Sequence, residues 1–528
     1  MQSTALSRTE HPRPSAEPTK SASLPLPWAV ATAVLAGVSL DLAYPSSGLW
    51  MLAIPSVILI LLSLIGRRTR SAFLVGGVYG TTFFLLHLDW VGSFLGPVPW
   101  LALASFQTVI VAAGCALIAW AYRWGETRLH GRWARLIVLP LVIASVWVLR
   151  ESVAGSWPYT GFPWARLGIT QSNGPLVEIV SWTGIAGLTF LLVAFSAAAL
   201  QAVRAWRVAG LRSAVMPAAA VCVLVLAPQF PTTDAGSFTV GWVQGNGPSG
   251  YFDRRSPGEI LASYVDATDG LLGEDVDVLA WPEGSVDSDP LRNPQTARIL
   301  DEVARAVRAP VLVNAATDRN RQTFNTSLLW DPTAPTPQVH DKRNPVPFGE
   351  YVPDRWFFEA VAPELVGLIK REYARGDNPP IMRVNDTRVG LAICFDVIYD
   401  DVIRESAAAG AQVLIFQTNN ADFRNTDENL QQLAFARMRA VETGRAVINV
   451  STVGTSQAIA PDGSIIHALP INTTASAVTT LPLRDGTTPA VQFGRPIEVL
   501  LSVGGVAFCL VVSTHARFRT RAPRKGKS

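Results

Sequence analysis

Long apolar stretches separated by short polar loops fill the first 230 residues of the chain, and one more lies near its C-terminal end. Seven fall near residues 26–44, 49–65, 71–89, 98–122, 136–151, 175–200 and 213–229, and an eighth near 496–513. Each is roughly long enough to cross a hydrocarbon core of about 30 Å as a helix. The pattern predicts a multi-span α-helical membrane domain with about eight spans.

Residues 230–495, between the seventh and eighth stretches, carry a different pattern. Charges become more frequent, apolar runs shorten, and strand-like and helix-like segments alternate. Strands are predicted over 238–244, 276–281, 311–314, 326–329, 389–393, 413–417 and 446–450, and helices over 297–308, 398–409 and 428–443. A Pro-Asp-Gly triplet at 461–463 indicates a hairpin turn. This region is predicted to be an α/β domain with a buried mixed sheet.

The placement of basic residues orients the chain in a membrane. With 49% hydrophobic and 16% charged residues, the chain of 528 residues is too apolar for an ordinary soluble protein. Arginines follow the second, fourth, sixth and eighth apolar stretches, whereas loops 45–48 and 90–97 contain no Lys or Arg and loop 152–174 contains only Arg166. By the positive-inside rule, both termini are cytoplasmic and the α/β domain is extracytoplasmic.

These two patterns predict a domain organisation. Residues 1–25 form a disordered cytoplasmic leader, 26–229 a membrane domain of seven spans, and 230–495 the extracytoplasmic α/β domain. Residues 496–513 form the eighth span and 514–528 a basic cytoplasmic tail. The basic tail fits a solvated segment that sets topology better than a nucleic-acid site, so no nucleic-acid partner is predicted.

Cys394 is the first candidate for chemistry, because it directly follows the predicted strand 389–393. The chain has four cysteines, and the other three, Cys115, Cys222 and Cys509, fall in predicted membrane spans. Cys394 therefore has no nearby disulfide partner although its domain is predicted to face an oxidising compartment. An unpaired thiol there favours a reactive role. The alternative is a small buried apolar side chain.

A carboxylate and an ammonium group also lie at predicted strand ends or loops. Glu283 follows the strand ending at Trp281, and Lys342 lies in a proline-rich loop at 340–353. Together with Cys394 they suffice for acyl transfer, which needs a base, a thiolate nucleophile and a cation for the oxyanion. Taken singly, Glu283 could instead cap a helix or pair with an arginine, and Lys342 could be a surface charge.

Five short segments carry a family resemblance. They are Trp-Pro-Glu at 281–283, the loop 342–353 with Lys-Arg and Val-Pro-Phe-Gly-Glu-Tyr-Val-Pro, Ile-Cys-Phe-Asp at 393–396, Arg-Met-Arg-Ala-Val-Glu-Thr-Gly-Arg at 437–445, and Gly-Phe-Pro-Trp at 161–164. The first four resemble the nitrilase (carbon–nitrogen hydrolase) superfamily. With the membrane spans and the fifth segment, the chain resembles the bacterial apolipoprotein N-acyltransferases over about residues 26–513. The resemblance implies a nitrilase-like α-β-β-α sandwich.

The resemblance also implies a reaction. Cys394 would take an acyl chain from a membrane phospholipid as a thioester, with Glu283 as general base and Lys342 and the Phe395 backbone amide holding the oxyanion. The acyl chain would pass to the N-terminal amine of the diacylglyceryl-cysteine of apolipoproteins, the last step of lipoprotein maturation, at the bacterial cytoplasmic membrane. Glu350 would support the triad, as would Asp396, where the family commonly has Glu. No metal site or cofactor is predicted.

Aromatic residues near these motifs are candidates for lipid contacts. Trp356, Phe357 and Phe358 follow the lysine loop and could form a mobile apolar lid, or else ordinary core packing. Trp164 could belong to an interfacial anchor and access loop, or to a plain aromatic belt. Phe423 is the remaining member of a family aromatic pair that lacks its tryptophan here.

Two other functions remain open at this point. A membrane-tethered amidase or nitrilase-type hydrolase would use the same triad with water as acceptor, but one anchor would suffice for it. A catalytically weak paralogue would only bind acylated lipoproteins. The mass of a lipoprotein discriminates between them, because only the acyltransferase adds an acyl chain.

Overall fold

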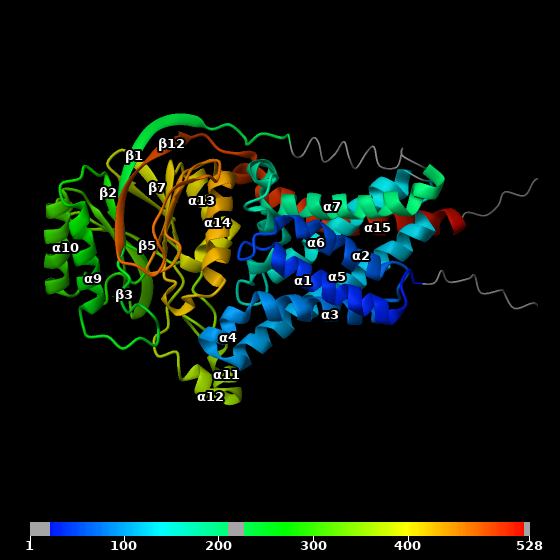
Figure 1. Ribbon diagram of the computed structural model, residues 1–528, viewed down its shortest axis with the longest axis horizontal. Coiled ribbons are helices and arrows are strands. Elements are labelled where there is room, and N and C mark those ends of the chain that lie inside the picture. The colour runs from blue at the N-terminus through cyan, green and yellow to red at the C-terminus, as the bar shows by residue number, and fades with distance from the viewer. Residues whose placement is uncertain (1–21, 132, 210–225, 522–528) are drawn as a thin grey trace, which may run out of the picture.

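The computed structural model describes residues 22–131, 133–209 and 226–521, and it has two parts, a bundle of long helices and a layered α/β domain (Figure 1). Most of the predicted leader, the larger part of the predicted span 213–229 and the end of the basic tail lie outside the described residues. Both ends of the described chain, the start of α1 and the end of α15, lie at the end of the bundle away from the α/β domain (Figure 1).

The helical part is built from the apolar stretches that the sequence marks. Its helices are α1 (Leu26–Ala43), η1 (Trp50–Leu52), α2 (Ala53–Leu64), α3 (Thr69–His87), α4 (Asp89–Leu95), α5 (Pro97–Arg128), η2 (Ala134–Val138), α6 (Leu139–Ala154), η3 (Pro163–Ala165), η4 (Leu167–Gln171), η5 (Val177–Ile179), α7 (Val180–Ala209) and α15 (Pro489–Arg521). Helices are required here because a segment in hydrocarbon must satisfy its backbone hydrogen bonds internally.

The described residues account for part of the predicted spans. Five described helical segments are long and apolar enough to cross a membrane, and there are six if α3 and α4, bent by 54°, form one span. The predicted span 71–89 is therefore not one straight helix, because Leu88 (φ −112°, ψ 21°) leaves helical geometry between the two. The predicted span 49–65 is a shorter apolar helix over Trp50–Leu64. A total of eight spans stays a prediction.

The α/β domain contains two six-stranded sheets. One has the order β12-β1-β2-β3-β4-β5 and the other β11-β10-β9-β8-β7-β6. The strands are β1 (Thr233–Gln244), β2 (Val278–Ala280), β3 (Val311–Arg319), β4 (Gln322–Trp330), β5 (Gln338–Asp341), β6 (Ile381–Val384), β7 (Thr387–Ile393), β8 (Val413–Thr418), β9 (Val447–Ser451), β10 (Gln457–Ile459), β11 (Ile465–Ala468) and β12 (Ala475–Asp485). Both sheets mix parallel and antiparallel pairs, as the alternation of strands and helices predicted.

The helices of this domain are α9 (Glu259–Thr268), η6 (Asp269–Leu271), α10 (Pro294–Val307), α11 (Arg355–Val361), α12 (Pro363–Val366), η7 (Cys394–Ile398), α13 (Asp400–Ala408), η8 (Ala421–Phe423) and α14 (Glu428–Thr443). Of these, α9 and α10 cover the outer face of the first sheet, α13 and α14 cover that of the second, and α11 and α12 protrude near α4 (Figure 1). One apolar core lies between the sheets, and a second lies between the first sheet and α9 and α10. The predicted α-β-β-α sandwich is observed.

The second sheet is joined to the helical bundle through α13 and α14. Their outward apolar residues, such as Ile403 and Phe435, belong to the same continuous core as the membrane helices. The helix predicted over 428–443 is present with those bounds. The helix predicted from 398 begins instead at Asp400, because residues 394–398 form a tight 3₁₀ turn that starts at the cysteine itself.

Candidate active site

Three strand ends bring the predicted catalytic side chains to one edge of the sandwich. Lys342 directly follows β5 and Cys394 directly follows β7, while Glu283 lies three residues beyond the end of β2. Glu283 and Lys342 are both buried, and Lys342 is only 1% exposed. The interpretations of Glu283 as a helix cap and of Lys342 as a surface charge are therefore wrong.

Lys342 is held between two carboxylates. Its Nζ lies 3.1 Å from Glu283 Oε1 and 2.9 Å from Glu350 Oε2. Burial lowers the pKa of Lys342, but the two carboxylates outweigh burial and hold the pKa well above its ordinary value. The ammonium group therefore keeps its proton at every physiological pH. A permanent cation at this depth can stabilise negative charge that develops beside it.

Asn325 orients the two carboxylates. Its Nδ2 donates to Glu283 Oε1 at 2.7 Å and to Glu350 Oε1 at 2.9 Å. Its Oδ1 accepts from Asn314 Nδ2 at 2.9 Å, and Asn314 Oδ1 accepts from the Gly284 backbone N–H at 2.8 Å. This chain of amides fixes the acid–lysine arrangement from β3 and β4. Neither asparagine is among the predicted site residues, although a polar residue inside a buried strand is a signal of a buried polar network.

Cys394 differs from the other described cysteines in its accessibility. Cys115 and Cys509 are buried, whereas Cys394 is partly exposed. Its φ of 49° lies in the left-handed region, which residues with a Cβ seldom adopt. This conformation turns the chain from β7 straight into the 3₁₀ turn, so the thiol stands at the end of the strand. Gln432 Nε2 donates to its Sγ at 3.4 Å.

The groups around the Cys394 thiol shift its pKa in opposite directions. Its position deep in the domain and the Glu283 carboxylate raise the pKa of Cys394 well above its ordinary value, and Lys342 lowers it. The resting group is therefore a thiol that needs a base, and Glu283 is the carboxylate whose charge acts on it most strongly. Geometry and charge suit a nucleophile that is activated only as it reacts.

Asp396 joins the loop that carries Lys342 to the 3₁₀ turn Cys394–Ile398, which we call the nucleophile turn. Its Oδ2 accepts from the Arg343 backbone N–H at 3.0 Å, and its Oδ1 accepts from the Asn344 backbone N–H at 2.8 Å and from Asn344 Nδ2 at 3.0 Å. These bonds tie the loop that carries Lys342 to the turn that carries Cys394. Burial raises the pKa of Asp396, and the charge of Lys342 opposes that shift.

Phe395 and Trp164 connect the nucleophile turn to the helical bundle. Their rings stack with centroids 6.3 Å apart and an interplanar angle of 20°, and Trp164 Nε1 donates to Gln431 Oε1 at 2.6 Å. Trp164 was predicted to lie in an interfacial anchor or an aromatic belt. It is only 1% exposed and packs between the two parts of the protein, so its indole does not itself face lipid, and an access role for the loop 161–164 stays a prediction.

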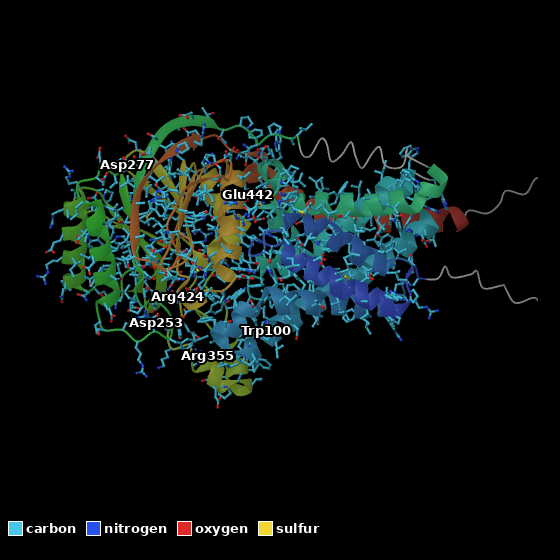
Figure 2. All side chains as sticks on the ribbon, in the orientation of Figure 1. Trp100, Asp253, Asp277, Arg355, Arg424 and Glu442 are labelled. Carbon is cyan, nitrogen blue, oxygen red and sulfur yellow. The ribbon has the colours of Figure 1, made fainter. Side chains whose placement is uncertain are left out.

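The other predicted lipid-contact residues lie beside the site in different ways. Trp356 and Phe357 on α11 are 77% and 45% exposed, which rules out core packing for these two. Phe358 packs on the small cluster formed by Val352, Val366 and Ile369. Phe423 contacts Phe94 of α4, with ring centroids 5.1 Å apart. Figure 2 labels Arg355, the residue before Trp356, at the edge of the domain near α4.

The described residues contain no group of three or more His, Cys, Asp or Glu side chains placed to hold a metal ion. The site therefore consists of one thiol, one ammonium group, three carboxylates and the amides that orient them.

Comparison with known proteins gives two family matches. Residues 36–198 match the model of the apolipoprotein N-acyltransferase N-terminal domain, and residues 240–487 match the model of the carbon–nitrogen hydrolases. The chain is 32% identical to an apolipoprotein N-acyltransferase of Mycolicibacterium smegmatis, over 94% of this chain and 87% of that protein. It is 27% identical to one of Shewanella oneidensis, over 89% of this chain and 93% of that protein.

Solved structures resemble the α/β part. A carbon–nitrogen hydrolase superfamily protein of Xanthomonas campestris is 16% identical with a TM-score of 0.35, and covers 51% of this chain and 97% of its own. A nitrilase-superfamily amidase of Nesterenkonia is 18% identical with a TM-score of 0.37, over the same shares of the two chains.

Proposed function

The chain belongs to the apolipoprotein N-acyltransferase family, and we propose that it acylates lipoproteins through a thioester on Cys394, with Glu283 and Lys342 completing the catalytic set. It is an N-acyltransferase with a carbon–nitrogen hydrolase domain. The observation that carries the residue assignment is the buried contact of 3.1 Å between Glu283 and Lys342 at the edge of the sandwich where the one partly exposed described cysteine stands.

In the first half-reaction, Glu283 takes the proton of the Cys394 thiol and the sulfur attacks an ester carbonyl of a membrane phospholipid. Lys342 stabilises the negative charge on the carbonyl oxygen of the tetrahedral intermediate. When the intermediate collapses, the C–O bond breaks and the lysophospholipid oxygen leaves with the proton from Glu283. The acyl chain remains on Cys394 as a thioester.

In the second half-reaction, the α-amine of a diacylated N-terminal cysteine attacks the thioester. Glu283 takes a proton from the amine, the C–S bond breaks, and the proton returns to Cys394. An amide forms and the free thiol is restored, so one sulfur serves both substrates in turn and ping-pong kinetics follow. Both substrates are held in the bilayer by acyl chains, which explains why this triad is joined to a membrane domain.

The arrangement of the chain ends supports an extracytoplasmic site. The start of α1 and the end of α15 lie at the end of the bundle opposite the α/β domain (Figure 1). Arg67 and Arg68 lie between α2 and α3, and Arg70 is the second residue of α3, so this connection is of the kind that the positive-inside rule assigns to the cytoplasm. We propose that the protein is a multi-pass protein of the bacterial cytoplasmic membrane with cytoplasmic termini.

Exposed aromatic side chains support a lipid-facing entrance. Trp356 and Phe357 lie on α11, and Phe252, which is also exposed, lies 6.0 Å from Phe94 of α4 between ring centroids. Indole and phenyl groups at this level favour the interface between water and lipid. We propose that α11 forms a lid over the path by which phospholipid reaches Cys394.

Intact-mass spectrometry of the purified full chain tests the proposal. Incubation with phospholipid should increase the mass of the protein by one acyl group. A diacylated lipopeptide with a free α-amine should then take up that acyl group, so that the protein returns to its original mass and the lipopeptide becomes heavier. The N-acetylated lipopeptide should not react, Cys394→Ala should gain no mass, and Cys509→Ala, which removes a buried thiol, should behave as the wild type. Release of free fatty acid with an unchanged lipopeptide would instead favour the tethered hydrolase, and no adduct and no release would favour a lipoprotein-binding paralogue.

A further inference from the structure

Three polar side chains behind the nucleophile have no part in the triad. Glu428 and Gln432 lie four residues apart on α14, and therefore on one face of the helix, and Asn420 lies just after β8. All three are buried, with Gln432 only 2% exposed. We call these three residues the α14 relay.

The relay is a continuous chain of hydrogen bonds that ends on the sulfur. Asn420 Nδ2 donates to Glu428 Oε2 at 2.8 Å and to Gln432 Oε1 at 3.0 Å. Gln432 Nε2 donates to Cys394 Sγ at 3.4 Å. Asn420 Oδ1 accepts from Ser451 Oγ at 2.6 Å and from Thr418 Oγ1 at 3.2 Å. The nitrogen and the oxygen of both side-chain amides therefore already make hydrogen bonds.

These hydrogen bonds fix which end of Gln432 faces the nucleophile. Glu428 Oε2 accepts from the NH₂ end of Asn420, both as a carboxylate oxygen and as the carbonyl oxygen of the neutral acid. That NH₂ group also occupies the oxygen end of Gln432, which leaves the NH₂ end of Gln432 for the sulfur. The side chain of Gln432 would otherwise be free to present its oxygen, which would repel a thiolate.

We propose that Glu428 and Asn420 are positioning residues that hold Gln432 as a hydrogen-bond donor to Cys394, so that the relay favours the thiolate in both half-reactions. A donor that binds the charged form of a thiol favours its ionisation. The relay would act at two moments, when the thiol first loses its proton and when the sulfur leaves the tetrahedral intermediate of the second half-reaction. It would thus assist the same atom as nucleophile and as leaving group.

The charges that face the sulfur are consistent with this role. Glu283 and Glu428 raise the pKa of Cys394, while Lys342 and the backbone N–H of Asn419 lower it. Burial raises the pKa of Glu428 to about 8, with Asn420 opposing the shift and Glu283 adding to it. Glu428 is therefore mostly protonated at neutral pH and can orient Asn420 without placing a second full negative charge beside the thiolate.

The proposal rests on Cys394 as the nucleophile, but its test needs neither substrate. The test is the rate at which iodoacetamide alkylates Cys394 in the full chain across a pH series, read from the mass of the peptide that contains it. Gln432→Met removes the donor at nearly constant length, and should slow alkylation at neutral pH about tenfold and raise the thiol midpoint by about one pH unit. Asn420→Leu, which frees Gln432 and leaves Glu428 in place, should act in the same direction, and Glu428→Gln, which can still accept from Asn420, should not raise the midpoint.

Gln431→Met is the matched control. Gln431 is the neighbouring residue on α14 and also 2% exposed, but it bonds Trp164 and His87 rather than the sulfur. Its loss should lower stability and leave the alkylation profile in place. A thiol midpoint that stays unchanged or moves down in both Gln432→Met and Asn420→Leu would contradict the relay. Unfolding cannot imitate the expected upward shift, because it exposes the thiol and moves the midpoint down, toward its ordinary value of about 8.5. Failure of acyl transfer in substrate assays would bear on the proposed function and leave this readout intact.

Discussion

Two clusters of buried charge lie within the α/β domain, and they are balanced in opposite ways. The active-site cluster of Glu283, Lys342 and Glu350 has two carboxylates for one ammonium group, and a thiol beside them. The second, which we call the docking cluster, consists of Arg166, Asp400, Arg404, Arg439 and Glu442, with three guanidinium groups for two carboxylates. One cluster has excess negative charge at a partly open site, and the other has excess positive charge in a closed one.

The docking cluster joins the helical bundle to the α/β domain. Arg166 comes from the loop after α6, and its Nη2 lies 2.6 Å from Asp400 Oδ1 at the start of α13. Arg439 Nη2 lies 2.7 Å from the same oxygen, and Arg439 also pairs with Glu442. Figure 2 shows Glu442 where α14 faces the helical bundle.

Two glycines of the membrane helices make room for this cluster. A Cβ on Gly184 of α7, whose φ is +70°, would stand 2.6 Å from Arg404 Nη2, and one on Gly494 of α15 would stand within 2.4 Å of the same guanidinium group. A side chain at either position would displace Arg404. The two helices therefore meet the α/β domain at the guanidinium group, which fixes their relative position.

The difference shows how the same ingredients give rigidity or reactivity. Burial raises the pKa of Asp400, but Arg166, Arg404 and Arg439 outweigh it and hold the pKa well below its ordinary value. The charged groups of the docking cluster are thus paired with one another and stay ionised. In the active-site cluster, the excess carboxylate and the strand-end thiol leave one proton to be moved, which is what catalysis requires.

Glu283→Gln should distinguish the two clusters most strongly, because it should lower activity far more than stability. The variant keeps the shape and the acceptor for Asn325 but loses the base, so acyl-enzyme formation should fall about a thousandfold. Stability should be kept, because Lys342 remains paired with Glu350. Single-turnover acylation and thermal melting measure the two effects. Glu405→Gln, at an exposed carboxylate 3.0 Å from Arg343, is the control and should change neither.

Asp400→Asn should have the opposite signature. It leaves three buried guanidinium groups with one carboxylate, so the free energy of unfolding should fall by about 3 kcal/mol. Acylation per folded molecule should change far less than in Glu283→Gln. Denaturant or thermal unfolding in detergent measures the loss, and Asp386→Asn, at an exposed surface pair, is the control. A fully stable Asp400→Asn protein would remove the distinction between the two clusters.

Protonation of Asp396 should change activity and stability in opposite directions as the pH falls. Burial raises the pKa of Asp396 to about 6, although Lys342 and the lysine-loop donors oppose the shift. Below that pH a proton competes with those donors, so acylation should fall several-fold. The folded protein binds this proton more tightly than the unfolded chain, so the contribution of Asp396 to stability should instead rise from pH 6 toward about 4. Asp396→Asn should lack both changes, and an unaltered acid limb in its rate profile would rule out Asp396 as the cause.

Trp356→Ser should have the smallest effect on the fold. Its indole is 77% exposed, so the melting temperature should hardly change. If α11 is a lipid-facing lid, the KM for phospholipid in vesicles should rise a few-fold while kcat stays nearly constant. Leu272→Ser, at a half-exposed residue of the α/β domain, is the matched control and should leave KM unchanged. Equal KM values for the wild type, Trp356→Ser and Leu272→Ser would contradict the proposal that α11 is a lid.

Periodicity located most elements of the α/β domain. The predicted strands 311–314, 389–393 and 413–417 lie within β3, β7 and β8, and the helix 428–443 is α14. Glu283 and Cys394 were predicted at strand ends and Lys342 in a loop, with their joint role taken from the family resemblance, and the structure places all three just after β2, β7 and β5. Local patterns suffice for these features because each depends on a few consecutive residues.

Contacts between distant segments could not be predicted. Asn325 reaches Glu283 across the sheet, and Trp164 reaches Gln431 of α14 from a loop of the membrane part. The sequence gives no measure of such distances, so it does not indicate that the Trp164 indole is buried against α14. The bend between α3 and α4 was also missed, because Leu88 is as apolar as the helices that it joins.

Peptide mapping of the acyl-enzyme tests the central claim most directly. The full chain is incubated with phospholipid and no acceptor, digested, and searched for acylated peptides with and without neutral hydroxylamine, which cleaves thioesters. We expect one acyl group, on the peptide that contains Cys394, and its loss with hydroxylamine. An acyl group on any other residue, or none in a preparation that still acylates a lipopeptide, would contradict it.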